Sequence, residues 1–439
     1  MHANSFAVSP VTAPLDIVVD IPGSKSITNR ALLIACQCDG PVVLRGVLFS
    51  DDSRHFLDCL QHLGYTVECD EATHCVRVMG TGKDIPRRDA SLYVGSAGTA
   101  ARFITALLAA APGTFTVNAS AQMMKRPMQP LLDSLTELGS TFTFLQQPYS
   151  LPFIIHGANW QGGTVHMHAE KSSQFLSALL ISGWRCARDL EIVLAGPLAA
   201  KPYIDMTINI MADFGVQVIQ EDYQRFRVPA GQRYQAPQSD YAIEPDVSNA
   251  CYFWAMATLT GGSVLVRGTH LHSKQGDIRF LRILEQLGSR IEDHADGVLV
   301  QGPVGGRFPG IEVDLGDMPD QTATLAAMAP FASSPTTIRN VGIIKYHETD
   351  RLQALVTELR RLGIQAEEIA DGLRIFPGIP HPAELETYDD HRMAMAMALI
   401  GLRAEGIRIK NPGCTAKTFE NYFEVFERLT TQSTEVSKQ

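Results

Sequence analysis

Apolar residues recur at intervals of three and four positions in five segments of the chain, and each segment ends in a glycine. In the first, Phe56, Leu57, Leu60 and Leu63 precede Gly64. This spacing predicts an amphipathic helix, and a glycine directly after the helix is typical of a left-handed C-terminal cap. The other copies end at Gly139, Gly215, Gly288 and Gly363. We expect a sixth helix of this kind to begin near Phe419.

A second, more uniformly apolar helix is predicted between each pair of these segments. Small and apolar residues fill it, as in 97–111 and 393–402, which favours a helix buried on most sides. The predicted starts lie near Ser26, Gly98, Ser173, Ser248, Gln321 and Asp390. Each repeat, about 75 residues long, therefore holds two helices and several short strands, which is a repeated α/β subdomain and not a solenoid.

Six α/β units in 439 residues predict two similar domains of three units each, because one ordinary core does not grow that large. We place the linkers near 21–23 and 242–244, beside proline or charged residues. The first domain is then 24–242, and the second is 1–20 plus 244–429. The polar residues 430–439 are predicted to form a disordered tail.

The net charge of −10 argues against nucleic acid or an anionic membrane as a partner, since phosphate backbones require a basic surface. No apolar run approaches the ~18 residues of a membrane span, and the first twenty residues lack the features of a signal peptide. The eight cysteines contain no C-x-x-C pair, so we expect reduced thiols, no zinc and a cytoplasmic location.

Cationic side chains collect at the predicted helix starts. A helix N-terminus has unpaired N–H groups and a partial positive charge, so it binds phosphate and carboxylate. The cations at these positions are Lys25, Arg30, Arg102, Arg126, Arg351, Arg392 and Lys417. Any one of these motifs is more simply a helix cap beside a solvated charge. Seven cations at helix starts in an acidic chain instead favour a site for a substrate with several anionic groups.

Other sites are less well supported. The segment 95–98 lacks the full dinucleotide fingerprint, and neither a phosphate-binding P-loop nor a Gly-x-Ser-x-Gly elbow occurs. The acidic pairs at 51–52 and 389–390 are too short to indicate a metal site. His391 alone is explained as a buried structural histidine with Asp390 as its partner.

Six motifs together resemble the EPSP synthase family of enolpyruvyl transferases. They are PGSKSITNR (22–30), SSQF (172–175), KPYI (201–204), ETDRL (348–352), DHRMAM (390–395) and CTAKTF (414–419). The resemblance implies two domains of three βαβαββ units with the active site in the inter-domain cleft. It implies transfer of the enolpyruvyl group of phosphoenolpyruvate to the 5-hydroxyl of shikimate 3-phosphate, in the pathway towards chorismate and the aromatic amino acids. We expect a monomer with no metal or organic cofactor.

The resemblance also assigns residues. Phosphoenolpyruvate contacts fall on Lys25, Gly98, Arg126, Gln174, Arg351, Arg392 and Lys417. Shikimate 3-phosphate contacts fall on Lys25, Ser26, Arg30, Ser172, Ser173, Gln174, Tyr203, Asp320 and His347. Catalysis is assigned to Asp320, Glu348 and Lys25, with the division of proton transfers among the three left open. Several cations suit a substrate with both a phosphate and a carboxylate.

Three positions depart from the commonest family pattern, and all are on the acceptor side. Ala200 replaces a serine, Ile343 replaces an asparagine, and His347 replaces a lysine. A relative that acts on another cyclic alcohol therefore stays an alternative. The UDP-N-acetylglucosamine enolpyruvyl transferases are disfavoured because 113–127 contains no cysteine. A non-catalytic scaffold that binds an anionic metabolite is disfavoured by the joint presence of Asp320, Glu348 and Lys25.

Overall fold

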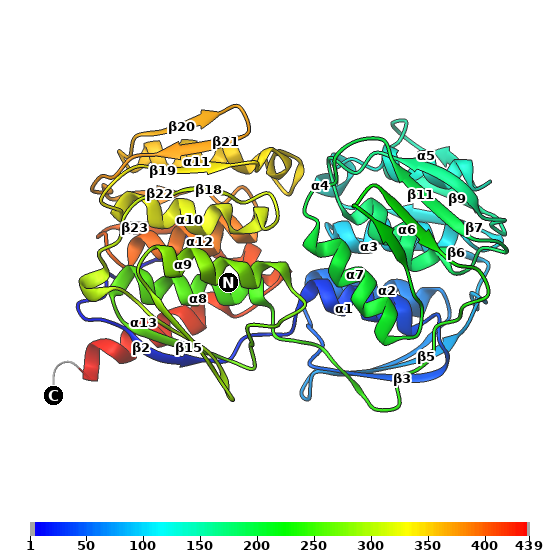
Figure 1. Ribbon diagram of the computed structural model, residues 1–439, viewed down its shortest axis with the longest axis horizontal. Helices are drawn as coiled ribbons and strands as arrows, with labels where there is room; N and C mark the ends of the chain where they lie inside the picture. Colours follow the sequence, from blue (N-terminus) through cyan, green and yellow to red (C-terminus); the bar gives the residue numbers. More distant parts are fainter. Residues whose placement is uncertain (1–4, 437–439) are drawn as a thin grey trace. The chain divides into compact units, whose positions relative to one another are not determined.

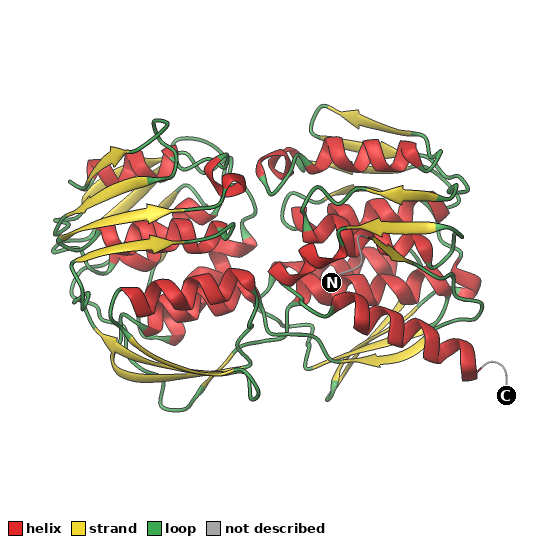
Figure 2. Ribbon diagram, turned by 180° about the vertical axis from the view of Figure 1, so that it is seen from behind, coloured by secondary structure: helices red, strands yellow, loops and turns green. Residues whose placement is uncertain are grey.

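The computed structural model describes residues 5–436 of the chain, with side chains up to 431. Its contacts divide the chain into two compact units. One is Gly23–Glu244, and the other consists of the described residues on either side of that segment. Within each unit, Figure 2 shows helices packed together and strands towards the outside.

The unit Gly23–Glu244 has three buried helices that pack against one another, α1 (Lys25–Ala35), α3 (Gly98–Ala109) and α6 (Gln174–Gly183). Three amphipathic helices accompany them, α2 (Asp51–His62), α5 (Gln129–Glu137) and α7 (Pro202–Asp213), with the short α4 (Ala121–Met124). The strands are β3 (Asp39–Arg45), β4 (Thr66–Asp70), β5 (Cys75–Thr81), β6 (Asp89–Tyr93), β7 (Gly113–Asn118), β8 (Thr141–Phe144), β9 (Phe153–Gly157), β10 (Gly163–Met167), β11 (Leu190–Leu194), β12 (Ile219–Glu221), β13 (Arg225–Val228) and β14 (Tyr241–Ala242).

The other unit repeats this plan. Its buried helices are α8 (Val247–Thr260), α10 (Thr322–Met328) and α12 (His391–Gly401), and its amphipathic helices are α9 (Phe280–Gln286), α11 (Arg351–Arg361) and α13 (Tyr422–Val436). Short 3₁₀ helices include η1 (Gly276–Arg279), η3 (Pro319–Gln321), η5 (Gly342–Tyr346) and η6 (Pro412–Lys417). The strands are β1 (Ser5–Ala7), β2 (Asp16–Val19), β15 (Ser263–Arg267), β16 (Arg290–His294), β17 (Gly297–Gln301), β18 (Glu312–Asp314), β19 (Thr336–Arg339), β20 (Ala366–Ile369), β21 (Gly372–Ile375), β22 (Ala383–Leu385) and β23 (Ile407–Lys410).

Each repeat builds one small sheet. In the second repeat, β6 pairs in parallel with β7 across α3, and β7 and β8 then pair antiparallel with β9. The order along the chain is βαβαββ, as the resemblance implies. Five sheets have four strands, and the sixth has the order β1-β23-β22.

Two strands are exchanged between repeats. Strand β2 directly precedes α1 in the sequence, yet it pairs in parallel with β15 in the other unit's first sheet. Strand β14 directly precedes α8, yet it pairs with β3. Figure 1 shows the exchange as a blue strand β2 beside the green strand β15. The first sheet of Gly23–Glu244 is therefore completed by β14, which lies just before α8. The first sheet of the other unit is completed by β2, which lies just before α1.

The helix predictions are confirmed. The buried helices begin within one residue of the predicted positions, and the glycines after the first five amphipathic helices have φ between 78° and 99°. Only glycine adopts this backbone without strain from a Cβ, so these residues end the helices. The last helix, α13, begins at Tyr422 because the η6 segment takes the residues before it.

The predicted disordered tail at 430–439 is wrong over its first part. Helix α13 continues through Val436, and residues 437–439 lie outside the described part of the chain. The Thr430 side chain is buried, and its hydroxyl donates to the carbonyl of Phe426 at 3.0 Å. The polar composition of the segment hid this internal bond, which lets a hydroxyl residue sit inside a helix.

Candidate active site

The N-terminal turns of α1, α3 and α6 lie against one another in the unit Gly23–Glu244. The Asn29 amide of α1 donates to Thr99 Oγ1 of α3 at 2.6 Å, and Arg102 Nη1 of α3 donates to Gln174 Oε1 of α6 at 2.6 Å. The unit therefore gathers three positive helix ends on one side of its core.

Arg30 connects several predicted acceptor ligands. Its guanidinium is 1% exposed and donates to the backbone oxygens of Ser26 at 2.9 Å and Tyr203 at 3.3 Å. It also donates to Thr207 Oγ1 at 2.7 Å and Ser177 Oγ at 3.2 Å. All four of these partners are neutral. Burial lowers the pKa of Arg30 to about 10, against a smaller opposing effect from Tyr203.

Arg102 is one of the cations at predicted helix starts, although the resemblance assigns it no substrate contact. Besides Gln174, its guanidinium donates to Ser172 Oγ at 3.5 Å and to the Pro127 carbonyl at 2.9 Å. It also lies over the Phe175 ring. Arg102 therefore fixes two predicted ligands and the backbone next to Arg126. Its position in the first turn of α3 was the only signal available in the sequence.

Gly98 begins α3 directly beside the Arg126 guanidinium. A Cβ at residue 98 would lie 2.8 Å from Arg126 Nη1, closer than real Cβ contacts allow. The structure thus brings these two predicted phosphoenolpyruvate ligands together. The missing side chain is what lets the guanidinium approach the helix start.

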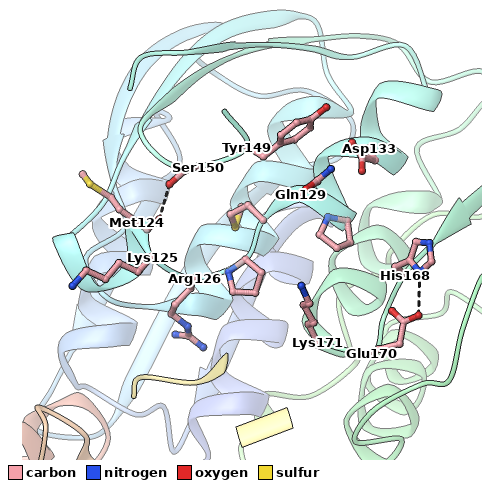
Figure 3. Close-up of a pocket in the computed structure, with 13 residues that line it drawn as sticks. Met124, Lys125, Arg126, Gln129, Asp133, Tyr149, Ser150, His168, Glu170 and Lys171 are labelled. Atoms are coloured by element: carbon pink, nitrogen blue, oxygen red, sulfur yellow. Dashed lines mark hydrogen bonds and ion pairs between the residues drawn. The ribbon is translucent and has the colours of Figure 1, made fainter. Parts of the chain in front are cut away.

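A cavity of about 550 Å³ opens beside Arg126 within the same unit. Figure 3 shows Lys125 on one side of it and the His168–Glu170 pair on the opposite side, where the side chains are 3.0 Å apart. The lining includes Arg126, Lys171 and Tyr149. Its mixed charge distinguishes this cavity from the cationic helix ends.

Lys25 in the first turn of α1 forms an ion pair with Asp52 of α2, with Nζ and Oδ2 3.4 Å apart. Ser173 directly precedes α6, and the Ser172 hydroxyl accepts from the Gln174 backbone N–H at 3.2 Å. The predicted ligands of this unit therefore lie on helix starts, held by hydrogen bonds.

The other unit has a cluster of charges centred on Arg351, the first residue of α11. The guanidinium donates to Asp390 at 2.7 and 3.1 Å, to Asp320 at 2.8 Å and to Glu348 at 2.8 Å. It is 2% exposed. One buried cation thus holds three carboxylates. Asp320 and Glu348 come from the same repeat as Arg351, and Asp390 comes from the next repeat. Asp390, which the sequence suggested only as a partner of His391, is the bidentate partner of Arg351.

Two more cations complete the cluster. Arg392 Nη2 lies 2.9 Å from Asp320 Oδ2, and its Nη1 donates to the Tyr252 hydroxyl at 3.4 Å. Lys417 Nζ lies 2.9 Å from Glu348 Oε1. Predicted catalytic and phosphoenolpyruvate-binding residues are therefore in direct contact here, although they come from sequence positions far apart.

The cluster keeps Asp320 ionised. Burial acts to raise the pKa of Asp320, but Arg392 and Arg351 outweigh it and hold that pKa well below its usual range. Burial would lower the pKa of Arg351, and the carboxylates, Asp390 first, raise it instead. Asp320 is thus a carboxylate at neutral pH, the form that accepts a proton.

His347 lies inside this cluster. Its Nδ1 is 2.9 Å from Arg351 Nη1 and 3.6 Å from Asp320 Oδ1. Because arginine can only donate, the short contact makes Nδ1 an acceptor. Of the other departures, Ile343 packs against the unit's core, and Ala200 has a left-handed backbone with φ of 50° just before α7.

Residues 5–436 contain no group of three or more His, Cys, Asp or Glu side chains placed to hold a metal ion. All eight cysteines are free. Within the same residues, every helix is too short or too polar to cross a membrane.

Comparison with known proteins agrees with the motifs. The family model described as EPSP synthase (3-phosphoshikimate 1-carboxyvinyltransferase) matches residues 11–426. A relative from Nostoc sp. that is named 3-phosphoshikimate 1-carboxyvinyltransferase is 47% identical over 97% of this chain and 99% of its own length. A relative of the same name from Shewanella loihica is 41% identical over 94% of this chain and 96% of its own length.

The fold agrees as well. The EPSP synthase structure from Acinetobacter baumannii superposes with a TM-score of 0.81 at 22% identity, covering 97% of this chain and 98% of that one. The enolpyruvyl transferase NikO from Streptomyces tendae superposes with a TM-score of 0.77 at 16% identity, covering 97% of each chain. The matched length and the identity of the full-length relatives show that the chain belongs to the EPSP synthase family.

Proposed function

We propose that the chain transfers the enolpyruvyl group of phosphoenolpyruvate to the 5-hydroxyl of shikimate 3-phosphate and releases phosphate. Relatives named 3-phosphoshikimate 1-carboxyvinyltransferase, 40–47% identical over nearly the whole chain, support this activity. The observation that carries it is the contact of Asp320 with both Arg351 and Arg392. This contact supports the proposal, because it brings an ionised carboxylate together with cations of the kind that an anionic substrate needs.

The proposed phosphoenolpyruvate ligands come from both units. Lys25, Gly98, Arg126 and Gln174 belong to Gly23–Glu244, whereas Arg351, Arg392 and Lys417 belong to the other unit. The proposal requires both sets to reach the same small substrate. Loss of Arg126 or of Arg392 should therefore weaken phosphoenolpyruvate binding, which titration of either variant would measure.

The proposed acceptor ligands are Lys25, Ser26, Arg30, Ser172, Ser173, Gln174, Tyr203, Asp320 and His347. Arg30 and Arg102 support this set, because their hydrogen bonds fix Ser26, Tyr203, Ser172 and Gln174. Hydroxyl groups at helix starts suit a phosphate that carries its own negative charge.

The proposed reaction is an addition followed by an elimination. The acceptor oxygen forms a bond to C2 of phosphoenolpyruvate while its proton passes to Asp320, and C3 gains a proton. The tetrahedral adduct then gives up a C3 proton, and phosphate leaves with the proton held by Asp320, which regenerates both the double bond and the Asp320 carboxylate. Glu348 is our candidate for proton transfer at C3, and Lys417, 2.9 Å from it, is a cation that can share the proton.

Substrate binding should activate Asp320. In the structure its two oxygens are held by Arg351 and Arg392. A phosphate or carboxylate that takes over some of these donors would weaken their hold. The pKa of Asp320 would then rise towards values useful for proton transfer.

We further propose a monomer in the cytoplasm. Burial raises the pKa of the thiols of Cys36, Cys38 and Cys59 to about 12, so these side chains are unreactive and suit a reducing compartment. Size-exclusion chromatography with light scattering would test the oligomeric state.

The deciding experiment is incubation with phosphoenolpyruvate and shikimate 3-phosphate. We expect phosphate release and a product whose mass equals the acceptor plus the enolpyruvyl group. Reactions without the acceptor, or with UDP-N-acetylglucosamine in its place, are the controls. Binding of both substrates without phosphate release would instead support the anion-binding scaffold.

A further inference from the structure

Asp277 is a buried carboxylate that the proposed reaction leaves without a role. It lies in η1, directly before α9, and is 3% exposed. Its Oδ2 accepts hydrogen bonds from the Ser248 hydroxyl and from Gln321 Nε2, the latter at 2.9 Å. No Lys, Arg or His in the described residues forms an ion pair with it. Burying a carboxylate with only neutral donors is unfavourable and calls for an explanation.

Gln321 connects Asp277 to the proposed base. It follows Asp320 in η3 and is fully buried. Its amide nitrogen donates to Asp277, and its amide oxygen accepts from Thr324 Oγ1 at 2.9 Å. Both ends of the Gln321 amide are therefore fixed, and with them the short helix that presents Asp320.

The charge of Asp277 also reaches Asp320. The carboxylates act on each other: burial first, and then Asp320, raises the pKa of Asp277 to about 6. Arg392 of α12, Ser248 of α8 and Gln321 of η3 oppose that rise. The thiol of Cys251 also faces Asp277 from α8, with Sγ 3.6 Å from its backbone oxygen. Asp277 is thus a further negative charge, besides Glu348, that acts on a base held by two arginines.

We propose that Asp277 is a positioning residue for the reaction: its carboxylate anchors Gln321 and η3, and its negative charge keeps Asp320 able to accept the acceptor's proton. Arg351 and Arg392 favour the ionised form of Asp320 so strongly that they make it a weak base. A nearby anion acts in the opposite direction, because like charge favours protonation. This inference rests on the proposed function of Asp320.

The test is Asp277→Asn, which removes the charge and keeps the shape. At pH 7.5 we expect kcat to fall about 10-fold, the effect of one unit in the pKa of the base. Michaelis constants should change little, since Asp277 touches neither proposed ligand set. As the pH falls through about 6, wild-type Asp277 takes up a proton and loses its charge. The ratio of wild-type to variant kcat should therefore shrink towards one below pH 6.

A purely structural role predicts something else. Loss of an anchor would lower kcat by the same factor at every pH, and a constant ratio from pH 5 to 8 would overturn the proposal. Asp317→Asn is the matched control, because Asp317 is an exposed carboxylate three residues before Asp320, paired with Arg279. It should leave kcat and its pH dependence unchanged.

Ser248→Ala gives a second, milder test. The Ser248 hydroxyl stabilises the Asp277 carboxylate, so its loss should raise the pKa of Asp277. The acid limb of kcat should then move to higher pH, while kcat above pH 8 stays near wild type. An unmoved limb would contradict the proposal. Wild-type turnover is measured alongside: if it is absent, the proposed function has failed, whereas a flat ratio in an active enzyme refutes only the role of Asp277.

Discussion

The two units hold their buried arginines in opposite ways. In Gly23–Glu244, Arg30 donates to hydroxyls and carbonyls, and Arg102 donates to a hydroxyl, a carbonyl and an amide oxygen. In the other unit, Arg351 is held by three carboxylates. Accordingly the pKa of Arg30 is lowered to about 10 by burial, whereas the carboxylates raise that of Arg351.

The difference suits two separate tasks, anion binding and proton transfer. A cation with neutral partners, as Arg30 has, keeps its positive charge available to attract the phosphate of a substrate. The cations with carboxylate partners hold Asp320 in its ionised form, which suits proton transfer. We therefore propose that the two units of similar fold contribute differently: both provide cations for anion binding, and the unit with Arg351 also supplies the acid–base groups Asp320 and Glu348.

Replacing Arg351 or Arg30 with methionine should give the largest difference in stability between the two kinds of buried arginine. Arg351→Met leaves three buried carboxylates without their shared cation, so we expect a loss of about 3–5 kcal/mol in the free energy of unfolding at pH 7. Arg30→Met leaves only neutral oxygens without their hydrogen-bond donor, so we expect a loss of about 1–3 kcal/mol in the free energy of unfolding. Urea denaturation of both variants measures the difference.

The pH dependence separates the two cases further. Without Arg351 the pKa values of its carboxylate partners should rise above those of the unfolded chain, so the folded state takes up protons as the pH falls. The loss caused by Arg351→Met should therefore shrink between pH 7 and 5. That of Arg30→Met should stay constant, and equal pH dependence would contradict the proposed difference between the two units.

Asp320→Asn should lower kcat about 100-fold or more, because it removes the proposed base. The same change frees Arg351 and Arg392 from their carboxylate partner, so phosphoenolpyruvate should bind at least as tightly as in the wild type. Glu348→Gln should show the same pattern. Steady-state kinetics and titration calorimetry report the two effects separately, and wild-type turnover in either variant would remove that residue from the mechanism.

Gly98→Ala should have a smaller and selective effect on the anion-binding unit. The new methyl group meets the Arg126 guanidinium at 2.8 Å and must displace it. We expect the Michaelis constant for phosphoenolpyruvate to rise about 10-fold, a loss of ~1.4 kcal/mol in binding, with little change for the acceptor. Gly413→Ala is the control, since its Cβ would meet nothing closer than Asn411 Oδ1 at 4.0 Å. Equal weakening of both substrates would place Gly98 away from phosphoenolpyruvate.

The features predicted correctly from the sequence are those that depend on interactions between residues close together in the chain. Helix spacing and the glycines Gly64 to Gly363 mark repeats because a left-handed cap needs no distant partner. The start of α12 was predictable because Asp390 caps it, its side chain accepting from the Arg392 backbone N–H at 2.9 Å. The same carboxylate's bond to Arg351, 39 positions earlier, depends on tertiary packing and left no local signal.

Other features of the site depend on long-range packing as well. Asp277 belongs to no sequence motif, and only its burial and its hydrogen bond from Gln321 distinguish it from the exposed acids. Strand β14 gave no sign that it joins β3, because a parallel pair carries no turn between its strands. The contact of His347 Nδ1 with Arg351 Nη1 also depends on how the chain folds before α11, and no sequence motif marks it.

The exchanged strand β2 has a consequence for synthesis of the protein. Asp16 of β2 bonds to Ser263 of β15, 247 positions later in the chain. A ribosome adding 5–20 residues per second takes roughly 10–50 s to cover that distance. During this time the whole unit Gly23–Glu244 emerges and can fold as a continuous segment, while β2 waits for its partner. We therefore expect vectorial folding in which β2, made near the start of synthesis, is paired only after the whole unit Gly23–Glu244 has been made. Until then its unpaired edge needs protection from pairing with other strands.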